Sequence, residues 1–321
     1  MPSATTHCLC GELALNSSNS SLNKIINQNR IAYYSGCQGP DFLMYYHILP
    51  WQNQKNAQEI RKLSTELHET KINAFFEKML AVAVEKKDEA LIAYVSGFLC
   101  HHALDSIAHP YIYYFTDSID KNTGYSHQIF ESQLDLGILQ NYKLTVKQYR
   151  TDKHIRKIKR GREAIGQTLK EAINTVYDAD VSAKEMLDGL DDMVRVVHLL
   201  TDVNGRRYRL IEFIEKLFNK PQMGTSMIVP QKYDDKLDAM NYRRDNWCYP
   251  TDADKKSNCG FEQLFQEAIN KTEREFIVLE NVLHGKQTIN DLLKLIGGCS
   301  YATGLSNGEK MTYFWKDRVE K

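Results

Sequence analysis

The sequence has little that would tie the protein to a membrane. No segment approaches the roughly 18 apolar residues of a membrane-spanning helix, and the first residues show no basic head followed by an apolar stretch. We therefore expect neither a transmembrane segment nor a secretory signal peptide. These absences predict a cytoplasmic protein without a stable membrane anchor.

An excess of charge of one sign is lacking as well. The 41 basic residues balance the 41 acidic residues, so no overall field attracts nucleic acid or an anionic membrane. Any contact with a polyanion therefore has to be local.

The cysteines show no disulfide pattern. There are seven of them, an odd number without a CxxC pair, which favours a reducing compartment over a disulfide framework. Cys8 and Cys10 are close enough in sequence to bind one metal together, but buried or free thiols are the favoured interpretation.

The pattern of apolar residues predicts an all-α fold. Apolar residues recur at intervals of three and four over most of the chain, whereas alternating runs of Val, Ile and Thr are scarce. With 321 residues, 42% of them hydrophobic, the chain can form one large core, and we expect a single domain over residues 1–321. The predicted helices span residues 20–29, 40–48, 54–87 with a break near His68, 88–109, 126–145, 161–177, 182–201, 205–218, 260–284 and 288–296.

The polar stretch at residues 220–260 interrupts this helical pattern. It contains prolines and aromatic residues, and long irregular segments in compact domains are often functional. We predict an irregular excursion that covers or borders a site.

Histidines and carboxylates recur at helical spacing in the first half of the chain. His101, Asp105 and His109 are four residues apart in an otherwise apolar helix, so they project from nearly one face. His127 and Glu131 repeat this spacing on the next helix. One such pair is usually an ordinary ion pair, but burying so many ionisable groups is costly unless a metal compensates them. Imidazole nitrogens and carboxylate oxygens are ligands that zinc prefers, so two packed helices would form a zinc cleft.

The neighbours of these residues are predicted to have structural roles. Pro110 is expected to end this helix or to kink it. His102 points about 100° away from His101, which indicates packing rather than metal binding.

Three segments carry a resemblance to a known family. They are GCQGPDF from Gly36, YVSGFLCHHALDSIAHPY from Tyr94 and SHQIFE from Ser126. Together they resemble the zinc-dependent phospholipase C family, bacterial phosphodiesterases that bind three zinc ions in an all-helical fold. The resemblance covers about residues 5–140, and it implies a phosphoric diester hydrolase with a metal cleft between helices.

The resemblance also implies which residues hold zinc. His101 and Asp105 match the family's HxxxD ligands, with Asp105 in the place of the carboxylate that bridges two zinc ions. Asp41 and His68 match ligands of one zinc of that pair, and Asp41 is also the candidate base for the attacking water. His7 matches an early histidine on the other bridged zinc.

A further zinc completes the expected set. His109, His127 and Glu131 match its ligands, so we expect two or three bound zinc ions in all. Asp105 and His109 are closer in sequence than their counterparts in secreted members, so this helix has to run further before it turns. Secreted members also use their N-terminal amine as a zinc ligand. Some toxins of the family add a membrane-binding β-sandwich at the C-terminus, whereas residues 140–321 are predicted to be helical, which argues against a toxin.

Two other functions stay open. A zinc-dependent nuclease of related helical fold uses a similar cluster, although it would need aromatic platforms and a basic groove for nucleic acid. A non-catalytic helical protein would use zinc only to hold its N-terminal half together, with closed coordination. For a phospholipase C-like enzyme, the expected substrate is a phospholipid or a related phosphodiester, small or dispersed rather than in an intact bilayer.

Overall fold

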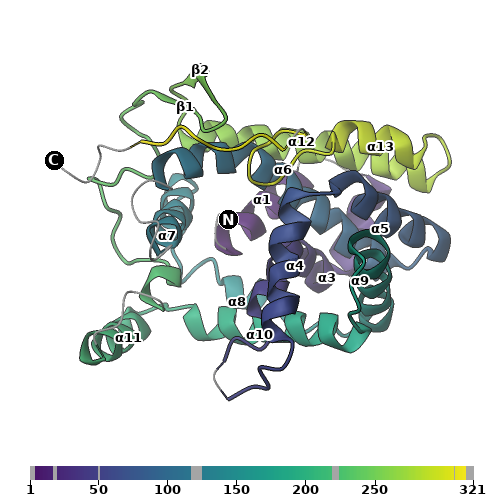
Figure 1. The fold of residues 1–321 in the computed structure, drawn as a ribbon, viewed down its shortest axis with the longest axis horizontal. Coiled ribbons are helices and arrows are strands. Elements are labelled where there is room, and N and C mark those ends of the chain that lie inside the picture. The colour runs from purple at the N-terminus through teal and green to yellow at the C-terminus, as the bar shows by residue number, and fades with distance from the viewer. Residues whose placement is uncertain are drawn as a thin grey trace.

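The protein is a bundle of helices around one central helix (Figure 1). The structure, a computed structural model, describes residues 4–16, 20–49, 51–116, 125–218, 224–306 and 308–315. Within these ranges, the only sheet is an antiparallel hairpin of β1 (Trp247–Tyr249) and β2 (Asp252–Ser257). The predicted all-α class is therefore confirmed.

The central helix is α6 (Glu89–Thr116). The helices α3 (Arg30–Gly36) and α12 (Phe261–Leu283) pack against it, and α1 (Ala4–Asn16) and α5 (Ile72–Lys86) also contact it. Almost every residue of α6 is buried. Its composition requires this, because a helix that is apolar on all sides is stable in water only inside a core.

The length and composition of α6 also meet the requirements of a membrane-spanning helix, which the sequence analysis did not expect of any segment. It is the one such helix in the part of the chain that the structure describes. However, 94% of its most apolar 18-residue window is buried inside the protein. Packing against the other helices therefore accounts for its apolar surface.

The remaining helices surround this core. In Figure 1, α5 and α9 lie side by side at the right, and α10 runs below the bundle. These helices, with η for the 3₁₀ type, are α2 (Ser21–Gln28), η1 (Gly39–Tyr45), α4 (Ala57–Glu69), α7 (Tyr125–Asn141), α8 (Thr151–His154), α9 (Arg162–Tyr177), α10 (Ala183–Leu200), α11 (Arg206–Leu217), η2 (Thr225–Met227) and α13 (Ile289–Ile296).

Most predicted helices match observed ones to within a few residues. The helices α1, α3 and α8 and the hairpin were not predicted from the sequence. The buried residues of α1 include Thr6 and His7, so its inner side is not marked by apolar residues alone. Residues 224–260 contain η2 and the hairpin and are otherwise irregular, while residues 220–223 lie outside the described ranges.

Pro110 does not end α6, which continues to Thr116. Because proline has no N–H, the carbonyl of Ser106 loses the helical hydrogen bond that residue 110 would normally donate. Gly304 packs closely against this carbonyl, since a Cβ at Gly304 would lie 2.4 Å from the Ser106 oxygen. Of the two outcomes expected for Pro110, the helix end was thus wrong, and α6 continues past His109.

Two glycines let α3 and α6 touch at the backbone. A Cβ on Gly97 would lie 2.1 Å from the carbonyl oxygen of Tyr33, and a Cβ on Gly36 would lie 2.0 Å from that of Tyr94. Both distances are far below van der Waals contact. The close approach brings the residues that follow α3 against the middle of α6.

Gly97→Ala is expected to destabilise the fold by about 1–3 kcal/mol, because α3 has to move away from α6 to admit the methyl group. A thermal melt followed by circular dichroism measures this change. Ser96→Ala is the matched control, because Ser96 is buried beside Gly97 and its hydroxyl donates to the Ile92 carbonyl of its own helix. An unchanged melting temperature in Gly97→Ala would contradict the importance of this contact.

Candidate metal centre

The eight residues predicted to hold zinc lie together around the middle of α6. Six of them are buried, and His68 and His127 are partly buried. They come from five elements: His7 from α1, Asp41 from η1, His68 from α4, His101, Asp105 and His109 from α6, and His127 and Glu131 from α7. The fold thus brings together every residue that the sequence analysis singled out, and none of them lies elsewhere.

The cluster contains three groups of residues that could each hold one metal ion. Within each group, the ligand atoms lie within 4.8 Å of one another. Two ligands of a tetrahedral zinc, each about 2 Å from the metal, lie about 3.3 Å apart. In each group one nitrogen–oxygen pair lies near this separation: His7–Asp105 at 3.2 Å, His68–Asp41 at 3.1 Å and His127–Glu131 at 2.8 Å. We name the three groups the deep group (His7, His101, Asp105), the middle group (Asp41, His68, His101) and the α7 group (His109, His127, Glu131).

The carboxylate of Asp105 connects the deep and middle groups. Its Oδ1 lies 3.2 Å from Nε2 of His7, whereas its Oδ2 lies 3.1 Å from Nε2 of His101 and 3.9 Å from Nε2 of His68. The two oxygens therefore face different histidines. This is the arrangement that a carboxylate bridging two metal ions requires.

Hydrogen bonds to the backbone orient three of the histidines. Nδ1 lies 2.6 Å from the Ser64 carbonyl in His68 and 3.1 Å from the Cys37 carbonyl in His101. Since a carbonyl oxygen only accepts, Nδ1 carries the proton and Nε2 presents its lone pair to the cluster. In His109, Nδ1 is likewise 2.8 Å from a backbone carbonyl. Such contacts commonly hold metal-binding histidines.

The polar atoms at the centre of the cluster lack hydrogen-bond partners among the described residues. These are Nε2 of His68 and His101 and both carboxylate oxygens of Asp105, all buried. A nitrogen lone pair that faces a carboxylate oxygen at about 3 Å is repulsive unless a proton or a cation lies between them. Because buried polar groups are nearly always satisfied, these residues fit a metal cation.

Two histidines and the central carboxylate favour the protonation states that bind a metal. Burial lowers the pKa of His109 to about 3 and the pKa of His127 well below its ordinary value. Burial opposes ionisation of Asp105, but the adjacent His109 and His101 hold the pKa of its carboxyl well below the ordinary value. Neutral imidazoles and ionised carboxylates are the forms that bind zinc. In His101, burial opposes protonation, but the adjacent Asp105 and Asp41 raise the pKa, so a metal there would replace a proton.

Gly39 makes room for His101. Its φ is +49°, and a Cβ there would lie only 2.1 Å from Cδ2 of His101. The turn that starts η1 therefore requires glycine for its conformation and for space. Asp41 follows two residues later, so the same turn sets the 4.0 Å distance between Oδ1 of Asp41 and Nε2 of His101.

The segment at residues 297–305 contributes contacts that the sequence analysis did not predict. The carbonyl of Tyr301 is the hydrogen-bond partner of His109 Nδ1. The ring centroid of Tyr301 lies 5.0 Å from that of His68. The carbonyl of Cys299 lies 2.8 Å from Nε2 of His102, so His102 packs behind the cluster, as predicted. Carbonyl groups are the same in every residue, so no sequence motif indicates these contacts.

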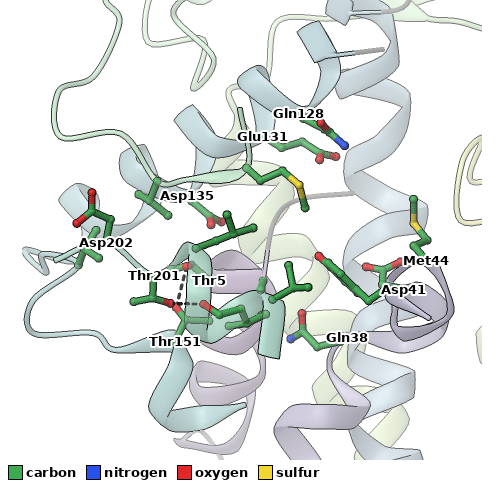
Figure 2. A pocket seen from close by; sticks show the side chains of 18 of the residues that line it. Thr5, Gln38, Asp41, Met44, Gln128, Glu131, Asp135, Thr151, Thr201 and Asp202 are labelled. Carbon is green, nitrogen blue, oxygen red and sulfur yellow. Dashed lines mark hydrogen bonds between the residues drawn. The ribbon is translucent and has the colours of Figure 1, made fainter. Parts of the chain in front are cut away.

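A cavity of about 180 Å³ opens beside the cluster (Figure 2). Asp41 and Glu131 both line it, and thereby give it access to the middle and α7 groups. Asp135 lines it too, but its carboxylate accepts hydrogen bonds from the backbone N–H and the hydroxyl of Thr6. The apolar part of the lining consists of Met44, Tyr45, Ile48, Val146, Val196, Val197, Leu200, Met227 and Val229.

Part of this cavity was predictable. Met227 and Val229 belong to the excursion at residues 220–260, which was expected to border a site. The contribution of α10 was not predicted, because its cavity residues are ordinary aliphatic side chains. The N-terminal amine, a ligand in secreted members of the family, belongs to residues 1–3, which lie outside the described ranges.

The fold and the site define an all-helical protein with buried histidine and carboxylate groups suited to zinc, beside a largely apolar cavity. The family model for zinc-dependent phospholipase C matches residues 6–182, more than half of the chain. The chain therefore belongs to the zinc-dependent phospholipase C family. The match extends beyond the residues 5–140 inferred from the sequence and includes all eight cluster residues. No curated protein and no solved structure matches the chain.

Protein purified without a chelator is expected to contain two or three zinc ions per chain, because eight possible ligands exceed what one tetrahedral site uses. Removal of the metal should lower the melting temperature, since the buried Asp105 carboxylate then loses its compensating charge. Elemental analysis and thermal melts measure both effects. Less than one zinc per chain would overturn this interpretation of the cluster.

Proposed function

We propose that the protein is a zinc-dependent hydrolase that cleaves a phosphodiester bond in a phospholipid or a related molecule, as a phospholipase C does. The observation that carries this proposal is the apolar cavity beside Asp41 and Glu131 of the cluster. Membership of the family supports the phosphodiester chemistry. The apolar lining supports a substrate with a hydrocarbon part next to the scissile bond.

In this proposal, the deep, middle and α7 groups hold the zinc ions. When bound, zinc lowers the pKa of water towards about 7 and stabilises the charge that develops on the phosphoryl group. Asp41 has its Oδ1 3.1 Å from Nε2 of His68, and it forms part of the cavity wall. We therefore assign to Asp41 the orientation and deprotonation of the attacking water.

Residues outside the predicted metal-binding part also belong to the proposed site. Val197 and Leu200 of α10 line the cavity, and the Tyr301 carbonyl orients His109. This supports one catalytic domain over residues 1–321 rather than an N-terminal enzyme with an independent C-terminal unit.

The cavity favours a lipid over nucleic acid. Among the described residues that line it, none is Lys or Arg, and about half are apolar. A nuclease would instead need cationic side chains for the phosphates and aromatic platforms for the bases. A purely structural role for zinc is disfavoured too, because the cavity reaches ligands of two groups rather than leaving them enclosed by protein.

Asp105→Asn is expected to abolish hydrolysis of phosphodiesters, whereas Glu131→Gln should leave measurable activity. The reason is that Asp105 faces two histidine sets, whereas Glu131 shares the α7 group with two histidines. Turnover of a chromogenic phosphodiester by each variant, together with its zinc content, measures this difference. Equal losses of activity at unchanged zinc content would contradict the role assigned to Asp105.

The substrate class is tested by comparing a short-chain, monomeric phosphatidylcholine with a chromogenic phosphodiester and single-stranded DNA. The proposal expects cleavage of the lipid between glycerol and phosphate. Cleavage of DNA alone would assign the nuclease function instead, and a zinc-loaded protein that cleaves none of the three would support the non-catalytic alternative.

Leu200→Gln is expected to reduce turnover of the short-chain lipid several-fold more than turnover of the chromogenic phosphodiester. Leu200 lines the cavity and is half-buried, and an amide in its place weakens contact with hydrocarbon. Leu295→Gln, on α13 at an exposed position, is the matched control. If Leu200→Gln affects both substrates equally, the cavity does not bind the apolar part of the lipid.

A further inference from the structure

Helix α11 presents most of its apolar residues to solvent, whereas its buried residue is a glutamate. Four of its apolar residues, Leu210, Phe213, Ile214 and Leu217, which we name the α11 face, are 43 to 66% exposed. Their spacing of three and four residues places them on one side of the helix. Glu215, on the opposite side, is the buried residue of this helix.

The contacts of Glu215 explain why the helix lies this way round. Its carboxylate accepts hydrogen bonds from the backbone N–H groups of Gly224 and Thr225 and from the Thr225 hydroxyl, at 2.6, 3.3 and 2.6 Å. These bonds attach the side of α11 that carries Glu215 to the start of η2. The α11 face consequently points away from the bundle, from which α11 stands apart in Figure 1.

The α11 face continues towards the mouth of the cavity. Leu210 lines a surface groove together with Leu199 and Trp51, which are 49% and 77% exposed. Met44 and Ile48 are 42% and 44% exposed and at the same time line the cavity. Leu199 of this groove is followed in α10 by Leu200, which lines the cavity, so exposed apolar side chains occur at both the groove and the cavity. Exposed apolar patches of this kind usually mark a binding surface.

The charges beside the α11 face are mainly positive. Arg206 and Arg209 are exposed, and so is Lys216, which pairs with Glu212 at 3.1 Å. Because the whole chain has no net charge, attraction to an anionic surface is confined to such a patch. Amphipathic helices that lie in the membrane interface combine apolar and cationic side chains in this way, and tryptophan favours the same depth.

The size of the cavity supports the same conclusion. Its volume of about 180 Å³ is below the roughly 300 Å³ at which pockets enclose a drug-sized ligand. A cavity of this size holds only part of a lipid with two long acyl chains. It therefore suits a lipid whose chains stay partly in the membrane while the phosphate reaches the cluster.

We propose that the α11 face, with Trp51 and Leu199, docks on a phospholipid bilayer that contains anionic lipids and holds the cavity mouth at the interface. This inference rests on the proposed function, because it specifies the physical form of the lipid substrate. It departs from the expectation that dispersed phosphodiesters are preferred over intact bilayers. That expectation rested on the lack of a transmembrane segment, of a clearly basic amphipathic anchor and of an added β-sandwich.

The test is co-sedimentation of the zinc-loaded full chain with vesicles of phosphatidylcholine alone and with added phosphatidylglycerol. The triple variant Leu210→Gln, Phe213→Gln, Leu217→Gln is expected to bind both vesicle types about tenfold more weakly or worse, because the α11 face no longer enters the interface. Arg206→Gln combined with Arg209→Gln should weaken only the binding to the anionic vesicles. Ile277→Gln, at a 58% exposed position of α12, is the matched control and should bind normally.

Hydrolysis of a soluble chromogenic phosphodiester, measured on every variant, separates the two proposals. Unchanged soluble turnover with lost vesicle binding supports the inference, and vesicle binding unchanged in the triple variant overturns it while leaving the proposed function intact. Absence of soluble turnover in the unmodified protein would count against the function whatever the vesicles show. A last outcome is that the unmodified protein does not bind vesicles and is a dimer in sedimentation velocity, whereas the triple variant is a monomer. The α11 face is then a contact between copies, and the inference is overturned.

Discussion

A single carboxylate in the apolar core imposes the main constraint on this structure. Asp105 is fully buried in α6, and an ionised carboxylate in such a place costs several kcal/mol unless an opposite charge compensates it. The segments that reach it, among them α1, η1 and α4, each bring a histidine or a second carboxylate to its surroundings. Their close packing on α6, including the glycine contacts with α3, serves to complete this one polar site inside a hydrophobic bundle.

The sequence predicted the components of this site better than its supports. His101, Asp105 and His109 were recognised because helical spacing alone places them on one face, and the fold agrees. The Tyr301 carbonyl was not recognised, because it depends on a contact between residues 192 positions apart. The helix end expected at Pro110 was wrong, and the segment around Gly304 that packs against the Ser106 carbonyl is likewise far along the chain. Long-range packing of this kind has no local signal in one sequence.

The two most informative regions of the protein reverse the usual distribution of polarity. Around Asp105, charged and polar groups occupy the centre of the core, and on α11 large apolar side chains occupy the surface. The loss of hydration opposes the first reversal, which a metal cation would compensate. The hydrophobic effect opposes the second, which the bonds of Glu215 to the start of η2 hold in place. Periodicity alone predicted α11 but could not indicate which side of it faces the protein, since periodicity carries no information about the rest of the fold.

The contact between Tyr301 and His109 has a consequence for the order of assembly. During synthesis the ribosome releases the N-terminal part of a chain first, and domains usually begin to fold in that order. All eight cluster residues precede residue 132, so they are available long before the backbone carbonyl that orients His109 is made. The orientation of His109 in this structure thus requires a segment that is synthesised after all eight cluster residues, so a chain released before residue 301 lacks this contact.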